Sequence, residues 1–471
     1  MRKTKIICTI GPACDNEETL TKMCQKGMNV ARLNFSHGTH EEHQVLIDLL
    51  KRVREKLNLP IAIMLDTKGP EYRIKTFENS KISLKDGDKF TFTTDDVIGD
   101  ETKVAVTYEN LTSELKVGDR ILVNNGLVVF EVEEIENNNV NCVVIAGGEL
   151  SNRKSMSFPN KVFKHEYLSQ QDRDDILFGI KNDVDFIAAS FVSNKSNVED
   201  IRKLLDENGG KDIDIIAKIE NRAGVDNIDD ICEVADGVMV ARGDLGVEIP
   251  YVEVPSVQKY LIEKCRLLGK RVITATEMLE SMIHNPRPTR AEISDVANAV
   301  YDGSSAIMLS GETAAGKYPV EAVKNMADIA KYTEEHIDYR RWFQTTDYKI
   351  ENTLDAVSHA TCAMAVDVKA RCIVVNSMSG ITARMVSRFR CPAVIVGATT
   401  SEKAWRRLNM SWGVIPVLSE EYSSVEVMFY QALNLAKNTL GLKSGDTVVL
   451  TGGLINGHSG NTNTIKVETI K

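Results

Sequence analysis

Eight short apolar runs in the sequence end in polar or charged residues, and this repetition constrains the fold more than any other feature. The runs alternate with helical patterns, so each one reads as a buried strand of a parallel sheet. Eight-stranded β/α barrels build their active sites at the carboxyl ends of the strands, which is where the polar residues fall. The pattern therefore predicts an α/β fold, a TIM-type (β/α)8 barrel with a site at that end. The runs are KIICTIG (5–11), MNVARLNF (28–35), IAIMLDTKG (61–69), DFIAASFV (185–192), IDIIAKIEN (213–221), GVMVARGDLG (237–246), RVITATEML (271–279) and AIMLSGET (306–313).

A stretch with a different sequence pattern separates the third run from the fourth. Residues 71–165 alternate between apolar and polar types, as in KISLKDGDKFTFTT and DRILVNNGLVVFEVEEI, which is typical of antiparallel strands. We expect a small β-barrel domain inserted at the catalytic rim and hinged as a lid. The flanking segments, 1–70 and 166–337, together hold roughly 240 residues, close to the usual size of a single (β/α)8 barrel.

The last part of the chain, residues 338–471, returns to an alternation of helices and strands, which predicts a third, α/β domain. Its predicted helices lie in NTLDAVSHATCAMAVDVKA (352–370) and ITARMVSRFR (381–390). Its predicted strands lie in RCIVVNSMSG (371–380), PAVIVGATT (392–400), DTVVLTGGL (446–454) and TIKVETIK (464–471).

Charge and cysteine content exclude several classes of protein. The 471 residues include 57 Lys and Arg against 67 Asp and Glu, a net charge of −10, which disfavours nonspecific binding of nucleic acid or anionic membranes. No apolar stretch approaches the length of a membrane span, and the short apolar run near the start is not a signal peptide. Nine cysteines without a Cys-x-x-Cys pair indicate reduced thiols, and hence a cytoplasmic protein.

The fifth and sixth runs place three charges close together. Lys218 and Glu220 are two residues apart and project from the same side of a strand, and the next run ends in Asp244. Neighbouring parallel strands bring the two acids side by side. Buried carboxylates are costly unless they are paired or bind a metal, so two explanations fit equally: an ion-pair network or a divalent-cation site.

The second and third runs carry a further polar group. Arg32, Asn34 and Ser36 lie on one face of a strand end, and an arginine there suits a phosphate. Asn34 and Ser36 offer neutral oxygens, which Asp66 and Thr67 would complete as a cage for a hard cation. For any one of these residues alone, a satisfied polar group at the rim is the simpler explanation.

Seven segments resemble the signature segments of pyruvate kinases, in the family's order and across nearly the whole chain. One such motif is only a hypothesis, but seven in order leave no room for chance. The resemblance implies transfer of the phosphoryl group of phosphoenolpyruvate to ADP, giving pyruvate and ATP in glycolysis. The segments are ARLNFSHG (31–38), DTKGPEYR (66–73), AKIEN (217–221), ARGDLG (241–246), ATEMLESM (275–282), NPRPTRAE (285–292) and SGETAAGKYP (310–319).

The resemblance also implies a role for each rim residue. The implied metal ligands are Glu220 and Asp244 for Mg²⁺ or Mn²⁺, and Asn34, Ser36, Asp66 and Thr67 for K⁺. The implied catalytic and substrate-binding residues are Arg32 and Lys218 at the phosphoryl group, Gly243, Asp244 and Thr276 at the substrate carboxylate, and Thr276 with Ser310 in proton transfer. A hydroxyl is a poor general acid, so we expect that proton to pass through water. The implied nucleotide contacts are Pro12, His37 and Arg73, and Glu71 matches the position associated with K⁺ dependence.

The chain departs from the family's pattern at three places on the rim. Asn124 and Asn125 stand where the family commonly has an Asp pair, which bears on the strength of lid closure. MSFPN (156–160) replaces the usual hinge segment, and Glu277 stands where glutamine is frequent. None of these changes falls on the implied metal or phosphoryl groups.

The third domain contains a candidate effector site at the start of its second helix. Ser377, Ser379, Gly380 and Thr382 offer hydroxyls and a glycine amide, which suits a phosphate, although an ordinary helix cap explains them as well. The resemblance implies a sugar-phosphate or nucleotide activator under the loop GLINGHSGNTN (453–463), and a homotetramer.

Two alternatives use the same residues for other functions. A metal-dependent lyase or aldolase on the same barrel would need Glu220, Asp244 and an enolate but no nucleotide. A non-catalytic sensor would bind metabolites through the third domain and keep the barrel as a scaffold. The sequence has no P-loop pattern and no dinucleotide-binding glycine fingerprint, which removes the commonest nucleotide-binding folds.

Overall fold

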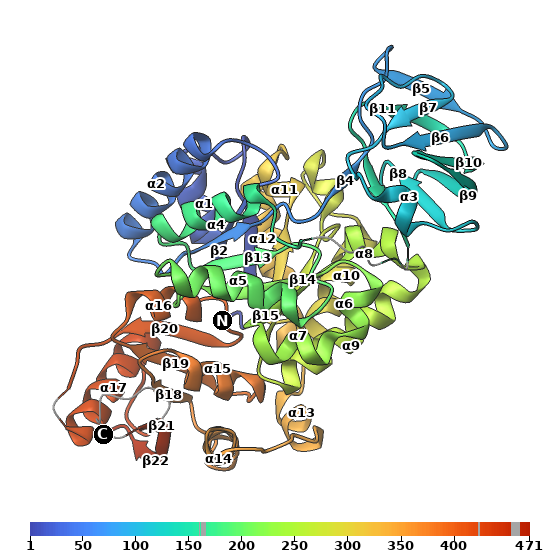
Figure 1. Cartoon of the computed structure of the whole chain (residues 1–471). Helices are drawn as coiled ribbons and strands as arrows, with labels where there is room; N and C mark the ends of the chain where they lie inside the picture. Colours follow the sequence, from blue (N-terminus) through green and yellow to red (C-terminus); the bar gives the residue numbers. More distant parts are fainter. Residues whose placement is uncertain (160, 162–165, 423, 454–461) are drawn as a thin grey trace.

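The computed structural model describes residues 1–159, 161, 166–422, 424–453 and 462–471. Figure 1 shows a central barrel, an all but separate β domain at upper right, and an α/β domain at lower left. Among the helices of these described ranges, none is both long and apolar enough to cross a membrane.

All eight predicted barrel strands are present and form one closed parallel barrel. Around the barrel they follow the order β1, β17, β16, β15, β14, β13, β3, β2. This confirms the predicted fold class and the assignment of each apolar run to a strand. The strands are β1 (Lys5–Thr9), β2 (Val30–Asn34), β3 (Ala62–Asp66), β13 (Phe186–Ala189), β14 (Asp214–Ile219), β15 (Gly237–Ala241), β16 (Arg271–Ala275) and β17 (Ala306–Leu309).

Helices cover the outside of the barrel, and capping side chains set several of their starts. Thr39 accepts from the Glu42 amide while the Glu42 carboxylate accepts from the Thr39 amide, and Thr289 and Glu292 repeat this capping box. Such caps satisfy backbone donors that have no partner within the helix. The helices are α1 (Glu17–Lys26), α2 (His40–Leu57), α4 (Gln170–Lys181), α5 (Lys195–Glu207), α6 (Arg222–Asp226), α7 (Ile228–Val234), α8 (Arg242–Glu248), α9 (Val254–Leu267), α10 (Arg290–Asp302), α11 (Gly311–Ala314) and α12 (Pro319–Glu335), with 3-10 turns η1 (Tyr251–Glu253) and η2 (Glu280–Ile283).

The inserted domain is a rolled β-sheet with its own aromatic core. Its seven-stranded sheet has the order β4, β12, β8, β9, β10, β6, β7, and a bridge between Ile74 and Val106 joins the two outermost strands. Phe90, Phe92 and Phe130 pack together inside it. Its elements are β4 (Tyr72–Arg73), β5 (Lys81–Leu84), β6 (Lys89–Thr93), β7 (Lys103–Ala105), α3 (Leu111–Glu114), β8 (Arg120–Val123), β9 (Val128–Glu136), β10 (Asn139–Ala146), β11 (Gly148–Ser151) and β12 (Ser155–Ser157).

The third domain is a five-stranded sheet with helices on both faces. The order is β20, β19, β18, β21, β22, and only β22 runs antiparallel to its neighbour. The predicted strands and helices are present, and α16, β20 and α17 were not individually predicted. The elements are α13 (Tyr339–Thr345), α14 (Thr353–Asp367), β18 (Cys372–Asn376), α15 (Ile381–Arg388), β19 (Val394–Thr399), α16 (Glu402–Leu408), β20 (Val414–Leu418), α17 (Val425–Leu440), β21 (Thr447–Gly453) and β22 (Thr462–Thr469).

A buried ion cluster attaches the third domain to the amino-terminal end of the barrel strands. Asp214, the first residue of β14, accepts from Arg271 Nη1 at 2.6 Å and from Arg407 Nη1 at 2.6 Å. Arg271 is the first residue of β16, and Arg407 lies on α16 of the third domain. The third domain therefore meets the barrel at the end opposite the carboxyl ends of the strands (Figure 1).

We predict that Asp214→Ala weakens this attachment strongly. Its pKa is held below the ordinary value because Arg271 and Arg407 outweigh the opposing effect of burial. Removing the carboxylate leaves two largely buried guanidinium groups unpaired, which costs about 3–5 kcal/mol. The check is urea unfolding of wild type, Asp214→Ala and the exposed control Asp212→Ala. Equal first transitions in all three proteins would contradict the prediction.

Candidate active site

One buried carboxylate organises the carboxyl end of the barrel. Asp66, the last residue of β3, is 1% exposed and accepts from Arg32 Nε at 2.6 Å and from Lys218 Nζ at 3.0 Å. Ser190 Oγ lies 3.3 Å from the same carboxylate. Burial pushes the pKa of Asp66 upward, but Arg32 and Lys218 outweigh it and hold that pKa below the ordinary value. The group is therefore an anion that gathers residues from four neighbouring strands.

Lys218 is held as a cation at the centre of this cluster. Its Nζ lies 2.7 Å from Ser190 Oγ, 3.0 Å from Asp66 and 3.1 Å from Glu220 Oε1. Burial alone would lower the pKa of Lys218, but the two carboxylates outweigh burial and raise it. The amine is thus a fixed positive charge, suited to binding an anion and not to acting as a base near neutral pH.

The positive charge near Glu220 does not fully offset the cost of burying its carboxylate. The side chain is fully buried, and its Oε2 accepts from the Phe191 amide at 2.6 Å. Oε1 is near Lys218 but has no acceptable hydrogen-bond geometry to any described donor. Burial raises the pKa of Glu220 to about 8, against the pull of Lys218 and with the help of repulsion from Asp244. An added cation at Oε1 would relieve this cost.

Asp244 supplies a second carboxylate on the neighbouring strand end. It follows β15 in the first turn of α8, is exposed, and lines the cleft beside the barrel. In the described part of the chain no group of three or more His, Cys, Asp or Glu is arranged to hold a metal. Mg²⁺ typically takes only one or two protein carboxylates and fills its other positions with water and substrate oxygens. Glu220 and Asp244 fit that donor set.

The predicted carboxylate-binding residues are close together. The Gly243 amide donates to Thr276 Oγ1 at 2.8 Å, and Arg242 Nη2 donates to the Thr276 carbonyl at 2.6 Å. Thr276 has a φ of 70°, a strained value for a β-branched residue. Such strain at a strand end is typical of a functional position.

The four predicted K⁺ ligands lie on adjacent strand ends. Asn34 is paired in register with Asp66, and its Oδ1 accepts from the Ser36 amide at 3.1 Å. Thr67 is buried, and its Oγ1 accepts from the Ser190 amide at 3.1 Å. The oxygens are of the type a hard cation prefers. Asp66, however, is also the acceptor for Arg32 and Lys218, which the sequence did not reveal.

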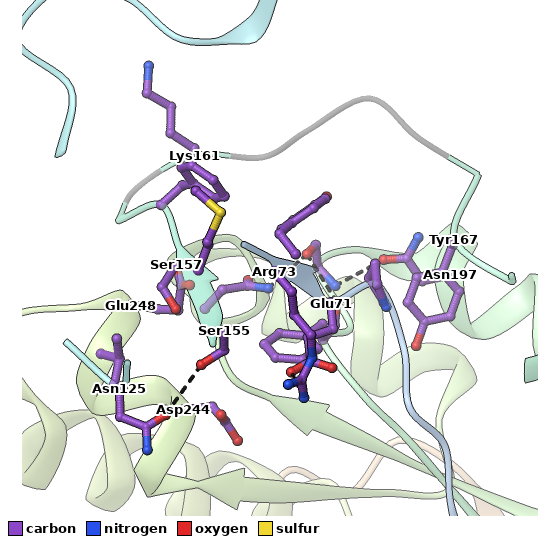
Figure 2. A pocket seen from close by; sticks show the side chains of 18 of the residues that line it. Glu71, Arg73, Asn125, Ser155, Ser157, Lys161, Tyr167, Asn197, Asp244 and Glu248 are labelled. Atoms are coloured by element: carbon purple, nitrogen blue, oxygen red, sulfur yellow. Dashed lines mark hydrogen bonds and ion pairs between the residues drawn. The ribbon is translucent and has the colours of Figure 1, made fainter. Parts of the chain in front are cut away.

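A cleft of about 690 Å³ separates the inserted domain from the barrel rim. Figure 2 shows Glu71 and Arg73 beside each other in it, with Asp244 below them. Arg73 Nη2 lies 2.6 Å from Glu71 Oε1, and its Nη1 donates to the Arg153 carbonyl at 2.6 Å. Among the described residues, the lining of this cleft includes Arg73 but not Pro12 or His37, both of which are exposed.

Ser310 and several residues without a predicted role complete the rim. Ser310 Oγ is buried with no hydrogen-bond partner among the described residues, while its amide donates to Glu312 Oε2 at 2.7 Å. Glu312 and Ser190 stood at strand ends in the sequence, yet no role could be assigned to them. The sequence did not indicate that the Phe191 amide donates to Glu220, because the orientation of this amide depends on a φ of 55° at Phe191.

The departures from the family's pattern have partial structural explanations. Asn124 and Asn125 have φ values of 57° and 56°, in the left-handed region that asparagine tolerates well, and both line the cleft. Glu248 of α8 hydrogen-bonds Ser157 and the Phe158 amide in the predicted hinge segment, and Figure 2 shows Glu248 beside Ser157. Asn160 of that segment lies outside the described residues. Nothing in the structure explains Glu277.

The candidate effector residues lie around the start of α15. Gly380 is the N-cap of this helix and has a φ of 80°, so the cap residue itself offers no side chain. Thr382 Oγ1 lies 2.6 Å from Thr462 Oγ1, the Ser377 amide donates to the Ala398 carbonyl, and Arg407 Nη2 donates to the Ser379 carbonyl at 3.4 Å. Residues 454–461 of the predicted covering loop lie outside the described residues.

We predict that Glu220 makes stability fall as pH rises. Its pKa is raised from 4.5 to about 8, so the folded protein binds one proton more than the unfolded chain between these pH values. The free energy of unfolding then decreases with pH in that window, by up to about 1.4 kcal/mol per pH unit. The check is urea unfolding from pH 5 to 9, without divalent cations, of wild type, Glu220→Gln and the exposed control Glu207→Gln. Equal pH dependence in wild type and Glu220→Gln would refute it.

Comparison with known proteins supports one family throughout the chain. The family "Pyruvate kinase, barrel domain" matches residues 1–323, and "Pyruvate kinase, alpha/beta domain" matches residues 355–468. A pyruvate kinase of Clostridium acetobutylicum is 46% identical over 473 residues, covering 100% of both chains. One of Bacillus licheniformis is 48% identical over 473 residues, covering 100% of this chain and 81% of its own.

A solved structure agrees with these sequence matches. The crystal structure of a pyruvate kinase from Cryptosporidium parvum superimposes with a TM-score of 0.95 at 39% identity, covering 100% of this chain and 96% of that one. The matches favour the kinase over the lyase and the sensor that the residues alone left open. The chain belongs to the pyruvate kinase family and is a pyruvate kinase by fold and by sequence.

Proposed function

We propose that this enzyme transfers the phosphoryl group of phosphoenolpyruvate to ADP as a step of glycolysis in the cytoplasm. The observation that carries the proposal is the convergence of Arg32, Lys218 and Glu220 within one buried cluster around Asp66. Two fixed cations suit a phosphoryl group, and an undercompensated carboxylate beside them suits a divalent cation. Phosphoryl transfer depends mainly on such positioning and neutralisation of charge.

In this proposal the chain divides as the sequence predicted. Residues 1–70 and 166–337 carry the chemistry, residues 71–165 act as a lid, and residues 338–471 regulate. The cleft between lid and rim supports closure over a substrate. The hydrogen bonds of Glu248 with Ser157 and Phe158 connect α8 directly to the hinge segment.

We assign Glu220 and Asp244 to Mg²⁺ or Mn²⁺. The bound ion would neutralise charge on the phosphoryl group and on the enolate as the bond breaks. Lys218 and Arg32 hold the phosphoryl oxygens from the other side, since both side chains are anchored on Asp66. Glu220 Oε1, which accepts no hydrogen bond from the described part of the chain, supports this assignment.

We assign the substrate carboxylate to the amides of Gly243 and Asp244 together with Thr276. The Gly243 amide now donates to Thr276 Oγ1, so substrate binding would exchange this internal hydrogen bond for two bonds to the carboxylate. Thr276 and Ser310 would then pass a proton to the enolate through water. The buried Ser310 hydroxyl, which has no hydrogen-bond partner among the described residues, supports that role.

We assign K⁺ to Asn34, Ser36, Asp66 and Thr67, and the nucleotide to Pro12, His37 and Arg73. Arg73 would have to leave Glu71 to reach the ADP phosphates. Glu71 would then lose its ion-pair partner in the same cleft, which links nucleotide binding to the need for a monovalent cation. We further propose a homotetramer and a phosphorylated activator at Ser377, Ser379, Gly380 and Thr382.

The role of Lys218 is tested by Lys218→Met. We expect ATP formation from phosphoenolpyruvate and ADP, with Mg²⁺ and K⁺, to fall about 100- to 1,000-fold, as when one donor to a transition-state charge is removed. Circular dichroism should show a retained fold, because Asp66 keeps Arg32 as a partner. The control is Lys22→Met on the exposed face of α1. A folded Lys218→Met enzyme with wild-type turnover would contradict the proposal.

Monovalent-cation dependence is a separate test. We expect turnover to fall at least tenfold when K⁺ is replaced by tetramethylammonium at constant ionic strength, because the four rim oxygens and Glu71 then lack a small cation. Titration of K⁺ back into the assay should restore the rate along a saturable curve. Equal turnover in potassium-free, sodium-free buffer would count against the K⁺ assignment.

A further inference from the structure

A crevice between the barrel and the third domain is lined by cations. It lies on the barrel side of α15 and next to the start of β16, at the end of the barrel opposite the active site. Among the described residues its lining contains no carboxylate. The cationic lining residues are Arg266, Lys270, Arg271, Arg384, Arg388 and Arg390.

Several donors in this crevice have no acceptor. The Nε groups of four of the arginines are buried without a hydrogen-bond partner in the part of the chain that the structure describes. Arg266, Arg388 and Arg390 are only 4%, 5% and 2% exposed. A buried guanidinium donor without an acceptor is costly, so these groups are unsatisfied as the protein stands.

Carboxylates nearby balance at most half of the charge of the six lining cations. Arg271 pairs with Asp214, Arg388 with Asp355 at 3.0 Å, and Arg384 with Asp236 at 3.6 Å. Within the described ranges, Arg266, Lys270 and Arg390 have no carboxylate partner. This leaves three cations that share one crevice.

Arg390 shows the imbalance most clearly. Its Nη groups donate to the Ser387 and Gly303 carbonyls, both at 2.9 Å, and Nη2 lies 3.2 Å from Ser305 Oγ. Burial, and then repulsion from Arg266, lowers the pKa of Arg390 to about 9. Burial also lowers the pKa of Lys270, with further lowering from Arg384. An anion in the crevice would remove these penalties.

We propose that this crevice binds a phosphoryl group, either as free phosphate or as part of a small phosphate monoester. The crevice has a volume of about 10 Å³, room for about one oxygen-sized atom. One phosphoryl oxygen enters there, and the others remain at the mouth, where Lys270 and Arg384 are partly exposed. A dianion matches three unbalanced cations better than chloride or a single carboxylate does.

The crevice is distinct from the group of candidate effector residues. Ser377, Ser379, Gly380 and Thr382 lie around the start of α15, whereas Arg384 and Arg388 lie further along the same helix and face the barrel. On the barrel side, Gly269 packs against Met385 and Arg388 just before β16 begins. A phosphoryl group here would tie α15 to the strand whose other end leads to Thr276.

Equilibrium dialysis of labelled inorganic phosphate at pH 7.5 and constant ionic strength tests the site. Wild type should bind phosphate saturably at millimolar concentrations, and Lys270→Gln combined with Arg384→Gln should weaken one site per chain at least tenfold. Arg371→Gln, an exposed arginine of the same domain, should bind like wild type. Lys218→Met and Thr382→Val, which alter the active site and the candidate effector site, should retain this site.

Competition experiments identify the class of ligand. Competition by glycerol phosphate as effective as by phosphate itself would identify a phosphate monoester as the ligand class, and competition by phosphate alone would identify the free ion. Both support the site. Unchanged phosphate binding in the folded double variant, loss of the same site in Lys218→Met or Thr382→Val, or no saturable binding to wild type would each overturn the proposal. If the double variant fails to fold, each single variant should still weaken the site.

Discussion

The contact between Asp66 and two cations is the interaction on which the active site depends. Asp66 ends β3, Arg32 comes from β2, Lys218 from β14, and Ser190 follows β13. A single buried carboxylate therefore connects residues from four strand ends at the mouth of the barrel. Without it, two buried cations would repel each other and turn toward solvent. With it, both cations present their remaining donors to the same space, where an anion can bind.

The two ends of the barrel show opposite charge imbalances. At the carboxyl end, Glu220 is a buried acid with too little positive charge near it. At the amino end, Arg390 and its neighbours are buried bases with too little negative charge. Each imbalance costs stability in the free protein and is relieved by a ligand of the opposite sign. Strands β14 and β16 connect the two ends: β14 begins at Asp214 and carries Lys218, and β16 begins at Arg271 and ends just before Thr276.

The fold was largely predictable from sequence, but the partners of the charges were not. Apolar runs that end in polar residues revealed all eight barrel strands, since a buried parallel strand needs a continuous apolar run. They also placed Lys218 and Glu220 together, because residues two apart share a face. Asp66 was expected only as a cation ligand, since periodicity does not show which neighbouring strand supplies its donors.

Other features depend on local conformation or on contacts between distant segments. The pairing of Arg73 with Glu71 depends on side-chain conformation, and the Phe191 amide on one positive φ. The cationic residues of the crevice are spread from 266 to 390, so no local cluster of basic residues in the sequence indicates the crevice. The crevice follows from how the barrel and the third domain pack, which a pattern within one segment does not contain.

The central claim is that Glu220 and Asp244 together hold the divalent cation beside Lys218. Electron paramagnetic resonance of Mn²⁺ titrated into the substrate-free protein measures this directly. The account predicts one site per chain, with affinity at least tenfold weaker in Glu220→Gln and in Asp244→Asn and unchanged in Asp200→Asn, which alters another carboxylate lining the same cleft. Equal Mn²⁺ affinity in wild type, Glu220→Gln and Asp244→Asn would contradict it.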